Sequence, residues 1–253
     1  MIGLLVSVRD AAEARTAAAC GVDFLDLKDP AAGALGGLPP ATIAHIVATV
    51  RAARPQLKIS ATIGDWPAHE LAAIDAAVAA VAACGVDFVK VGVPGQGGEG
   101  AHALLQRLGA SAHTIVPVLI ADHGVDDALF RAACALRFPA LMMDTQEKLG
   151  GSLLDRLPAA VIARLIDAAR KAAKPLGLAG ALRLDEVTQL RALQPAFAGF
   201  RSAVCEGVRS SALDGAKLRG LRAALQGEPA ASARRPAEQS DAGRPGTAAL
   251  QRS

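Results

Sequence analysis

Aromatic side chains are the scarcest feature of this sequence. Its 253 residues include no tyrosine, one tryptophan and six phenylalanines. Proteins that bind single-stranded nucleic acid stack the bases on exposed aromatic side chains. The 27 lysines and arginines outnumber the 24 acidic residues by three, and they are scattered rather than gathered in a basic stripe. We therefore expect no nucleic-acid partner, while the small positive balance suits a small anionic substrate.

Long uninterrupted apolar segments are also missing. The longest apolar run, 71–83, is interrupted by Asp75 and is too short to cross a bilayer. The apolar start of the chain stops at Arg9 and Asp10, which makes it shorter than the core of a signal peptide. The four cysteines form no C-x-x-C pair, which favours four reduced thiols. These absences predict a cytoplasmic protein without a membrane partner.

Short segments rich in β-branched residues alternate with longer segments of helical period. We expect strands at 2–8, 22–28, 57–64, 86–92, 114–121, 140–144, 175–180 and 197–204. We expect helices at 11–20, 39–54, 68–84, 101–110, 125–136, 153–174, 184–193 and 211–226. Eight strand–helix pairs in a chain of this length predict an α/β fold, the (β/α)8 TIM barrel. An open, doubly wound sheet is the main alternative.

An internal repeat supports the barrel. Segment 18–28 (AACGVDFLDLK) matches segment 82–92 (AACGVDFVKVG), 64 residues further along the chain. Two strand–helix units separate the copies, so the motif recurs on the second and fourth strands. Each copy indicates the end of a helix, a Cys-Gly stop and then a strand. Aligning the copies places Asp26 at the position equivalent to Lys90.

The barrel is predicted to fill residues 1–226 as a single catalytic domain. The remaining residues, 227–253, are rich in Pro, Gly, Ser, Ala, Arg and Gln and have no periodic apolar face. Such a composition does not bury enough apolar surface to fold, so we interpret this segment as a disordered tail. A tail that binds a partner or regulates the barrel is the alternative. We also expect the chain to form a homo-oligomer.

Charged residues follow apolar ones along three of the predicted strands. The second strand ends with Asp26 and Lys28 on one face, the fourth carries Lys90, and the sixth ends with Asp144. In a parallel barrel, the carboxyl ends of the strands build the active site, and alternate strands fill a common interior layer. Burying an unpaired charge is costly. We therefore expect Asp26, Lys90 and Asp144 in one layer of a shared pocket, with Lys28 nearer the mouth.

Such a cluster suits chemistry on carbonyl groups. A free lysine amine has a pKa of about 10.4 and is protonated at neutral pH. A second ammonium nearby, or partial loss of solvent, lowers the pKa of an amine, which then attacks a carbonyl carbon and forms an iminium ion. The carboxylates or the other amine would move protons. The alternative is that Asp26–Lys90 and Asp144–Lys28 are ion pairs that only close the top of the barrel.

Candidate phosphate ligands follow the last three strands. Lys148 begins a loop that ends in two glycines, and it either reaches a phosphate or lies in solvent. Barrels usually bind phosphate with the loops after strands seven and eight, which here contain Gly180 with Arg183, and Arg201 with Ser202. Small residues let backbone N–H groups approach an anion, and arginine adds charge. The alternative for each is an ordinary turn into a helix.

Two further motifs are considered. Residues 95–100 fit G-x-G-x-x-G, the pattern of a dinucleotide-binding turn, but they follow the fourth strand instead of opening a βαβ unit. We interpret them as a loop over the pocket, so no nucleotide cofactor is expected. His123 follows the fifth strand and is a candidate pocket residue. It has no companion His or Cys at ligand spacing, and we expect no metal.

The segments that carry these residues resemble a known family. Segments 22–30 (VDFLDLKDP), 86–92 (VDFVKVG) and 143–148 (MDTQEK) are similar to those of (5-formylfuran-3-yl)methyl phosphate synthase, the first enzyme of methanofuran biosynthesis. The similarity runs from about residue 1 to 226. It implies a TIM barrel that condenses two molecules of glyceraldehyde 3-phosphate into 4-(hydroxymethyl)-2-furancarboxaldehyde phosphate, with release of one phosphate and two waters.

The resemblance also implies roles for individual residues. Lys28 would form the Schiff base and Lys90 would accept protons, while Asp26, Asp144 and Lys148 would support them. No metal or redox cofactor would be needed, and the only partner implied is a phosphorylated triose. Two alternatives stay open. One is a different Schiff-base aldolase or isomerase on a phosphorylated sugar, and the other is a barrel without activity that binds a ligand or an assembly partner.

Overall fold

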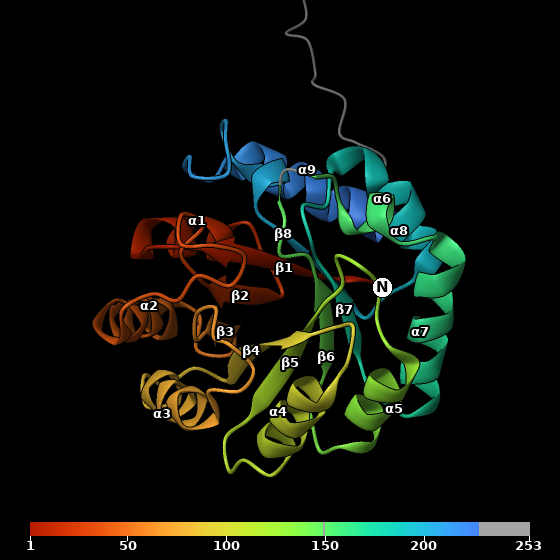
Figure 1. Cartoon of the computed structure of the whole chain (residues 1–253). Helices are drawn as coiled ribbons and strands as arrows, with labels where there is room; N and C mark the ends of the chain where they lie inside the picture. Colours follow the sequence, from red (N-terminus) through yellow and green to blue (C-terminus); the bar gives the residue numbers. More distant parts are fainter. Residues whose placement is uncertain (149, 228–253) are drawn as a thin grey trace, which may run out of the picture.

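Within residues 1–148 and 150–227, which the computed structural model describes, the chain forms a closed barrel of eight strands surrounded by helices (Figure 1). The strands are β1 (Gly3–Val8), β2 (Phe24–Leu27), β3 (Lys58–Thr62), β4 (Phe88–Pro94), β5 (Ile115–Ile120), β6 (Leu141–Asp144), β7 (Leu176–Leu178) and β8 (Phe197–Phe200). The helices are α1 (Ala11–Ala19), α2 (Pro40–Ala53), α3 (Leu71–Ala82), α4 (Glu99–Gly109), α5 (Asp127–Ala135), α6 (Leu153–Arg156), α7 (Ala159–Lys171), α8 (Val187–Leu193) and α9 (Gly215–Gln226), with 3-10 turns η1 (Leu184–Glu186) and η2 (Ser202–Val204).

Every strand pairs in parallel with its neighbours in the sequence, and β1 pairs with β8 to close the ring. Leu5 of β1 lies opposite Phe24 of β2, and Gly3 lies opposite Phe197 of β8. Because all strands run the same way, their carboxyl ends meet at one rim. The predicted (β/α)8 barrel is therefore confirmed, and the doubly wound sheet is excluded.

The repeated motif has the structure that its sequence predicts. α1 ends at Ala19, and Gly21 follows with a φ of 74°. α3 ends at Ala82, and Gly85 follows with a φ of 83°. Residues with a Cβ rarely adopt this left-handed conformation, which ends a helix and turns the chain toward the next strand.

Most predicted elements differ from the observed ones by a few residues at their ends, and two of the differences bear on the site. The helix expected over 153–174 is two helices, α6 and α7, with Pro158 at the break. Proline cannot donate a backbone hydrogen bond and is tolerated only at the start of a helix. The strand expected over 197–204 ends at Phe200, after which the chain turns through η2. Because β8 ends early, Arg201 lies in the loop that follows the strand and not in the strand itself.

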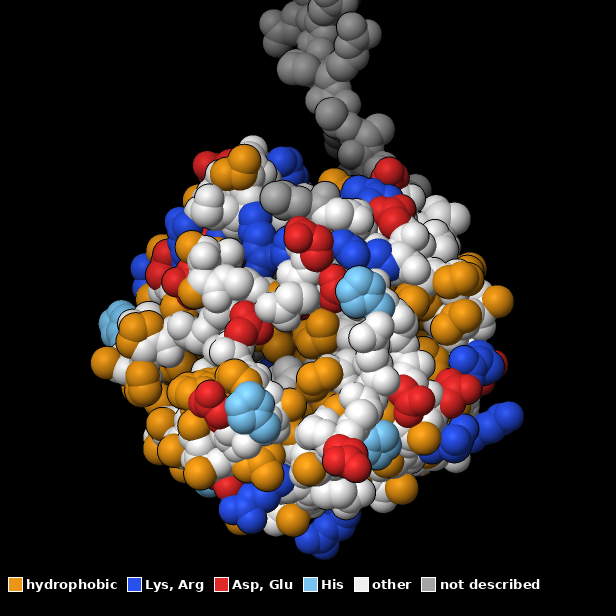
Figure 2. All heavy atoms as spheres, viewed as in Figure 1, with side chains coloured by type: hydrophobic (Ala, Val, Ile, Leu, Met, Phe, Trp, Pro, Cys, Tyr) orange, Lys and Arg blue, Asp and Glu red, His pale blue; other side chains and the backbone are white. Residues whose placement is uncertain are grey.

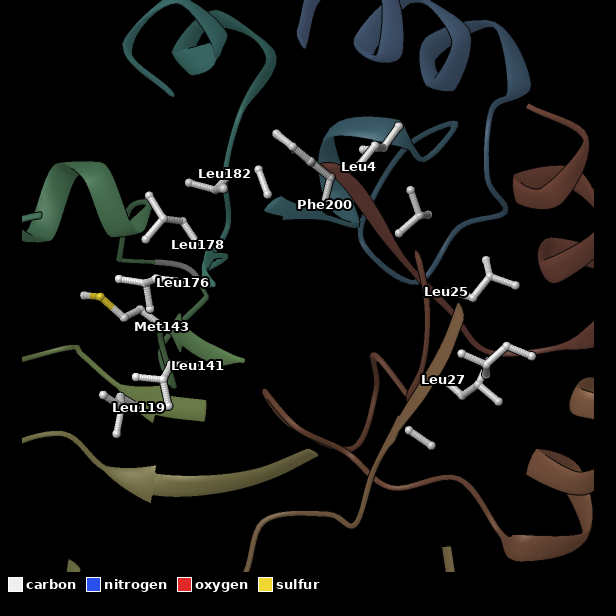
Figure 3. Close-up of a cluster of buried hydrophobic side chains, with 14 of the residues drawn as sticks. Leu4, Leu25, Leu27, Leu119, Leu141, Met143, Leu176, Leu178, Leu182 and Phe200 are labelled. Atoms are coloured by element: carbon white, nitrogen blue, oxygen red, sulfur yellow. The ribbon is translucent and has the colours of Figure 1, made fainter. Parts of the chain in front are cut away.

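The apolar core has two layers. The outer layer lies between the strands and the helices, and Figure 3 shows side chains of this layer, among them Leu25, Leu141 and Leu178, pointing away from the strands toward the surrounding helices. The inner layer lies inside the barrel and includes Leu5 and Met142. The rings of Phe24 and Phe197 pack against each other in the same region, with their centroids 5.5 Å apart. This inner layer supports the charged residues that follow it on the same strand faces.

Helix α9 lies at the end of the predicted domain. α9 ends at Gln226, and Gly227 continues in the left-handed conformation, with a φ of 82°. The rest of the predicted tail, 228–253, lies outside the described residues. In the described part of the chain, none of the helices has both the length and the apolar character that spanning a membrane requires.

Candidate active site

β2, β4 and β6 carry their charged residues to the same end of the barrel. Asp26 lies in β2 and Lys28 directly follows it, Lys90 lies in β4, and Asp144 is the last residue of β6. All four side chains are buried, with exposed fractions between 1% and 6%. The structure therefore brings together the mixed cluster of amines and carboxylates that the strand pattern predicts.

The cluster is a continuous chain of ion pairs. Lys90 Nζ lies 3.0 Å from Asp26 Oδ1, and Lys28 Nζ lies 4.0 Å from Asp26 Oδ2. Lys28 Nζ also lies 3.8 Å from Asp144 Oδ2, while Lys148 binds the other oxygen of Asp144. Asp26 is thus shared by two amines on neighbouring even-numbered strands. Lys28 lines a small cavity together with Asp144 and Lys148, whereas Lys90 lines a second cavity bordered by Phe24, Phe88 and Phe197.

Both carboxylates keep their charge despite burial. Burial alone would raise the pKa of Asp26, but Lys90, Lys28 and a hydrogen bond from Ser60 outweigh it and hold that pKa below its ordinary value. Burial would likewise raise the pKa of Asp144, and Lys148 and Lys28 reverse the effect. At neutral pH these groups are therefore anions that hold and orient the amines.

Two of the amines release their protons more easily than ordinary lysines do. Burial lowers the pKa of Lys90, and the attraction of Asp26 offsets this only in part. Burial also lowers the pKa of Lys148, against the opposing attraction of Asp144. A buried amine with a lowered pKa can act as a base at lower pH than a solvated one.

The loop from β2 to α2 covers this cluster. Lys28 Nζ donates a hydrogen bond of 3.2 Å to the carbonyl of Ala34, which fixes the amine under the loop. The next residue, Leu35, is 2% exposed and belongs to the apolar layer inside the barrel. Leu35 packs so closely on Gly92 that a Cβ at position 92 would lie 2.8 Å from Leu35 Cδ1. A larger residue at position 92 would force the end of the Leu35 side chain to shift.

A small cavity opens beside Lys28, on the side of the barrel formed by β6, β7, β8 and β1. Three of the four predicted phosphate ligands, Gly180, Arg201 and Ser202, line it together with Lys148. Gly180 has a φ of 106°, which glycine alone adopts easily. Figure 2 shows Lys and Arg side chains gathered, with Asp and Glu among them, over the part of this face where β8 and α9 lie in Figure 1.

The two predicted arginines are not free to bind phosphate. Arg201 lines the cavity, but its guanidinium is buried and forms a two-fold ion pair with Glu13 of α1, with Nη2 2.9 Å from Glu13 Oε1. Arg183 is 45% exposed and pairs with Asp155 of α6 and with Asp185 and Glu186 of η1. Sequence alone does not predict these partners, because the partner of Arg201 lies 188 residues away.

We expect the Arg201–Glu13 pair to stabilise the rim of the barrel. Replacing Glu13 by glutamine leaves a buried guanidinium without its counter-charge, and breaking a buried pair in this way costs about 3–5 kcal/mol. Denaturant unfolding should show this loss. As the control, Arg164→Gln removes an exposed ion pair with Asp127 and should change stability little. Equal stability of both variants would show that the buried pair has no such role.

The remaining sequence candidates lie apart from the cluster. His123 is exposed, and the neighbouring Asp122 accepts hydrogen bonds from the backbone of Gln146, at 2.5 Å, and Glu147, at 2.9 Å. Asp122 therefore anchors the loop that carries Lys148. The glycine-rich segment 95–100 forms the turn from β4 and the first residues of α4, and among the described residues it contributes none to the cavity beside Lys28.

Fold and cluster together define a (β/α)8-barrel enzyme with buried amines at its active end. A model of the family described as 4-HFC-P synthase matches residues 4–222. The chain is 39% identical over 232 residues to a Methylorubrum extorquens protein provisionally named (5-formylfuran-3-yl)methyl phosphate synthase, covering 91% of this chain and 94% of the relative. It is 33% identical to the Archaeoglobus fulgidus enzyme of the same name, covering 82% and 92%. The chain belongs to the 4-HFC-P synthase family.

Solved structures share the fold at low identity. Phosphoribosyl anthranilate isomerase from Thermus thermophilus superposes with a TM-score of 0.61 at 16% identity, covering 89% of this chain and 99% of that one. 3-Hexulose-6-phosphate synthase from Salmonella typhimurium superposes with a TM-score of 0.59 at 15% identity, covering 90% and 100%. At these identities the likeness shows the barrel alone.

Proposed function

We propose that this enzyme is a (5-formylfuran-3-yl)methyl phosphate synthase that condenses two molecules of glyceraldehyde 3-phosphate through a Schiff base on Lys28. The observation that carries the proposal is the sharing of Asp26 by Lys28 and Lys90, at 4.0 and 3.0 Å. Iminium chemistry needs one amine as nucleophile and a second group that moves protons, and this pair supplies both. The names of the family members supply the product, and glyceraldehyde 3-phosphate is the substrate that the sequence resemblance implies.

The reaction divides into steps that these residues support. One triose phosphate isomerises, and its carbonyl carbon bonds to Lys28 Nζ with loss of one water as the iminium forms. A proton moves from the adjacent carbon to Lys90, and the resulting enamine carbon attacks the aldehyde of the second triose. Loss of one phosphate, ring closure and dehydration give the furan, and water hydrolyses the iminium to restore Lys28. The sum releases one phosphate and two waters and is redox-neutral.

The charge of the cluster suits this sequence of steps. Asp26 and Asp144 stay ionised because neighbouring amines lower the pKa of each carboxyl. Anions on both sides of Lys28 stabilise the positive charge that appears when the iminium forms. The lowered pKa of Lys90 lets this amine accept a proton from carbon, and the resulting ammonium is held against Asp26.

The experiment uses purified full-length enzyme with glyceraldehyde 3-phosphate as the only substrate. We expect a furan chromophore and one free phosphate for each furan, after subtraction of the phosphate that the substrate releases without enzyme. An aldol product without phosphate release would support a different Schiff-base aldolase instead. No reaction and no borohydride-trapped adduct would leave a barrel that binds ligands without catalysis.

A further inference from the structure

Arg209 is a cation at the active end of the barrel that has no place in the mechanism above. It lies in the segment between η2 and α9, and its backbone is held firmly. Arg201 Nε donates to the carbonyl of Arg209 at 2.9 Å, and Arg201 Nη2 donates to the carbonyl of Ser211 at 2.9 Å. The buried Arg201–Glu13 pair therefore fixes the segment that presents Arg209.

The side chain of Arg209 lines the same cavity as Lys28 and Lys148. Its Nη2 donates to the carbonyl of Gly33, at 3.2 Å, in the loop that covers Lys28. Among the residues that the structure describes, its Nε is buried and has no hydrogen-bond partner. A buried donor without a partner costs free energy unless a ligand satisfies it. The Nε–H of Arg209 is thus a hydrogen-bond donor that is available to a ligand bound beside Lys28.

The charges around the cavity do not balance without a ligand. Arg201 is neutralised by Glu13, and Lys148 binds Asp144. Of the other charged residues that line the cavity, Lys28, Lys148 and Arg209 face one carboxylate, Asp144, so two positive charges remain in excess when both amines are protonated. A phosphate monoester carries close to two negative charges at neutral pH, which is the charge that this excess would match.

The cavity is too small to hold a phosphate group, so one of the contacts across it must open when phosphate binds. Its volume is about 20 Å3, which is room for about one water molecule. The Arg201 side chain donates two hydrogen bonds to Glu13, whereas within residues 1–148 and 150–227 the Arg209 side chain donates one, to the carbonyl of Gly33. Exchanging this one bond for phosphate oxygens frees space beside Lys28 and removes the link to the β2–α2 loop.

We infer that Arg209 binds the phosphate group of the triose that reacts with Lys28, releasing the carbonyl of Gly33 as it does so. The planar guanidinium presents paired N–H donors that match two phosphate oxygens, and its Nε adds the donor that is now without a partner. Arg201, which the sequence places in a phosphate loop, holds the backbone of this residue instead of the ligand. The inference rests on the proposed function for the identity of the triose, but phosphate binding itself does not.

The first test therefore uses inorganic phosphate and needs no turnover. We expect the full-length enzyme to bind phosphate in titration calorimetry, and Arg209→Gln to weaken binding roughly ten- to hundredfold, as expected for a lost bond to a charged group. Arg209→Lys should fall between the two, because it keeps the charge without the paired donors. Arg164→Gln, on the outer face of α7, should bind as the wild type does. A thermal melt checks that each variant is folded.

The second test compares two trioses in the borohydride trap. We expect Arg209→Gln to need roughly ten- to hundredfold more glyceraldehyde 3-phosphate for half-maximal adduct, with little change for glyceraldehyde, which lacks the phosphate. Equal phosphate binding by wild type and Arg209→Gln, or equal loss for both trioses, would overturn the inference. If the wild type binds phosphate through Arg209 but forms no adduct, the proposed function fails and the assignment of Arg209 stands.

Discussion

Lys28→Arg is expected to abolish turnover while the protein stays folded. Guanidinium keeps the positive charge between Asp26 and Asp144, but it does not form an imine with a carbonyl carbon. Loss of a nucleophile costs roughly a thousandfold or more in turnover. The measurement is furan formation from glyceraldehyde 3-phosphate, together with mass spectrometry of the borohydride-reduced adduct. We expect one adduct per chain in the wild type, located on Lys28, and none in the variant.

Lys58→Arg is the matched control for this substitution. Lys58 starts β3 at the opposite end of the barrel, where its exposed amine pairs with Asp87 at 3.1 Å. The same change of amine to guanidinium should leave turnover and adduct unaltered there. Retained turnover in Lys28→Arg would contradict the Schiff base on Lys28. An adduct on Lys90 in that variant would show that the two amines have the opposite roles.

The barrel and its charged layer follow from local patterns in the sequence. Side chains alternate between the two faces of a strand, and a parallel barrel brings all strand ends to one rim. Those two rules suffice to place Asp26, Lys90 and Asp144 together. The repeat adds independent support, since it puts Asp26 and Lys90 at equivalent positions on β2 and β4, and the structure pairs them at 3.0 Å.

The loops could not be predicted in the same way. Arg201 follows β8 as a phosphate ligand would, but Glu13 of α1 binds its guanidinium, and the sequence contains no periodicity that connects the two. Arg209 and Leu35 also take their places through contacts with Gly33 and Gly92 on other segments. Such long-range ion pairs decide which lysine or arginine at the end of the barrel remains available to a ligand. Each carboxylate that pairs with one of these cations removes it as a phosphate ligand.

Lys90→Met is expected to lower turnover by roughly 10²- to 10⁴-fold, the usual contribution of a positioned base, while the adduct on Lys28 still forms. Methionine has a similar length and no charge, and Asp26 keeps Lys28 as its partner at 4.0 Å. Single-turnover trapping separates the two steps, because adduct formation should change far less than furan formation. An equal loss in both would show that Lys90 acts on binding or on the formation of the imine.

The pH dependence distinguishes a base from a structural ion pair. Burial lowers the pKa of Lys90 below that of an ordinary lysine, so the fraction of neutral amine rises with pH through that lowered value. Turnover should therefore increase with pH below about 10.4, the ordinary value for lysine, and Lys90→Met should lose this increase. The unfolded chain binds more protons than the folded one in this window, so stability should rise with pH as well.

Lys148 is the competing source of such a pH dependence, since burial lowers the pKa of this amine too. The two lysines differ in position. Lys90 is paired with Asp26, which also touches the reacting amine, whereas Lys148 binds Asp144 from the loop after β6. We therefore expect Lys148→Met to weaken substrate binding and to keep the rise of turnover with pH. If that rise disappears in Lys148→Met and persists in Lys90→Met, the base is Lys148, and the shared carboxylate serves only to hold Lys28 in place.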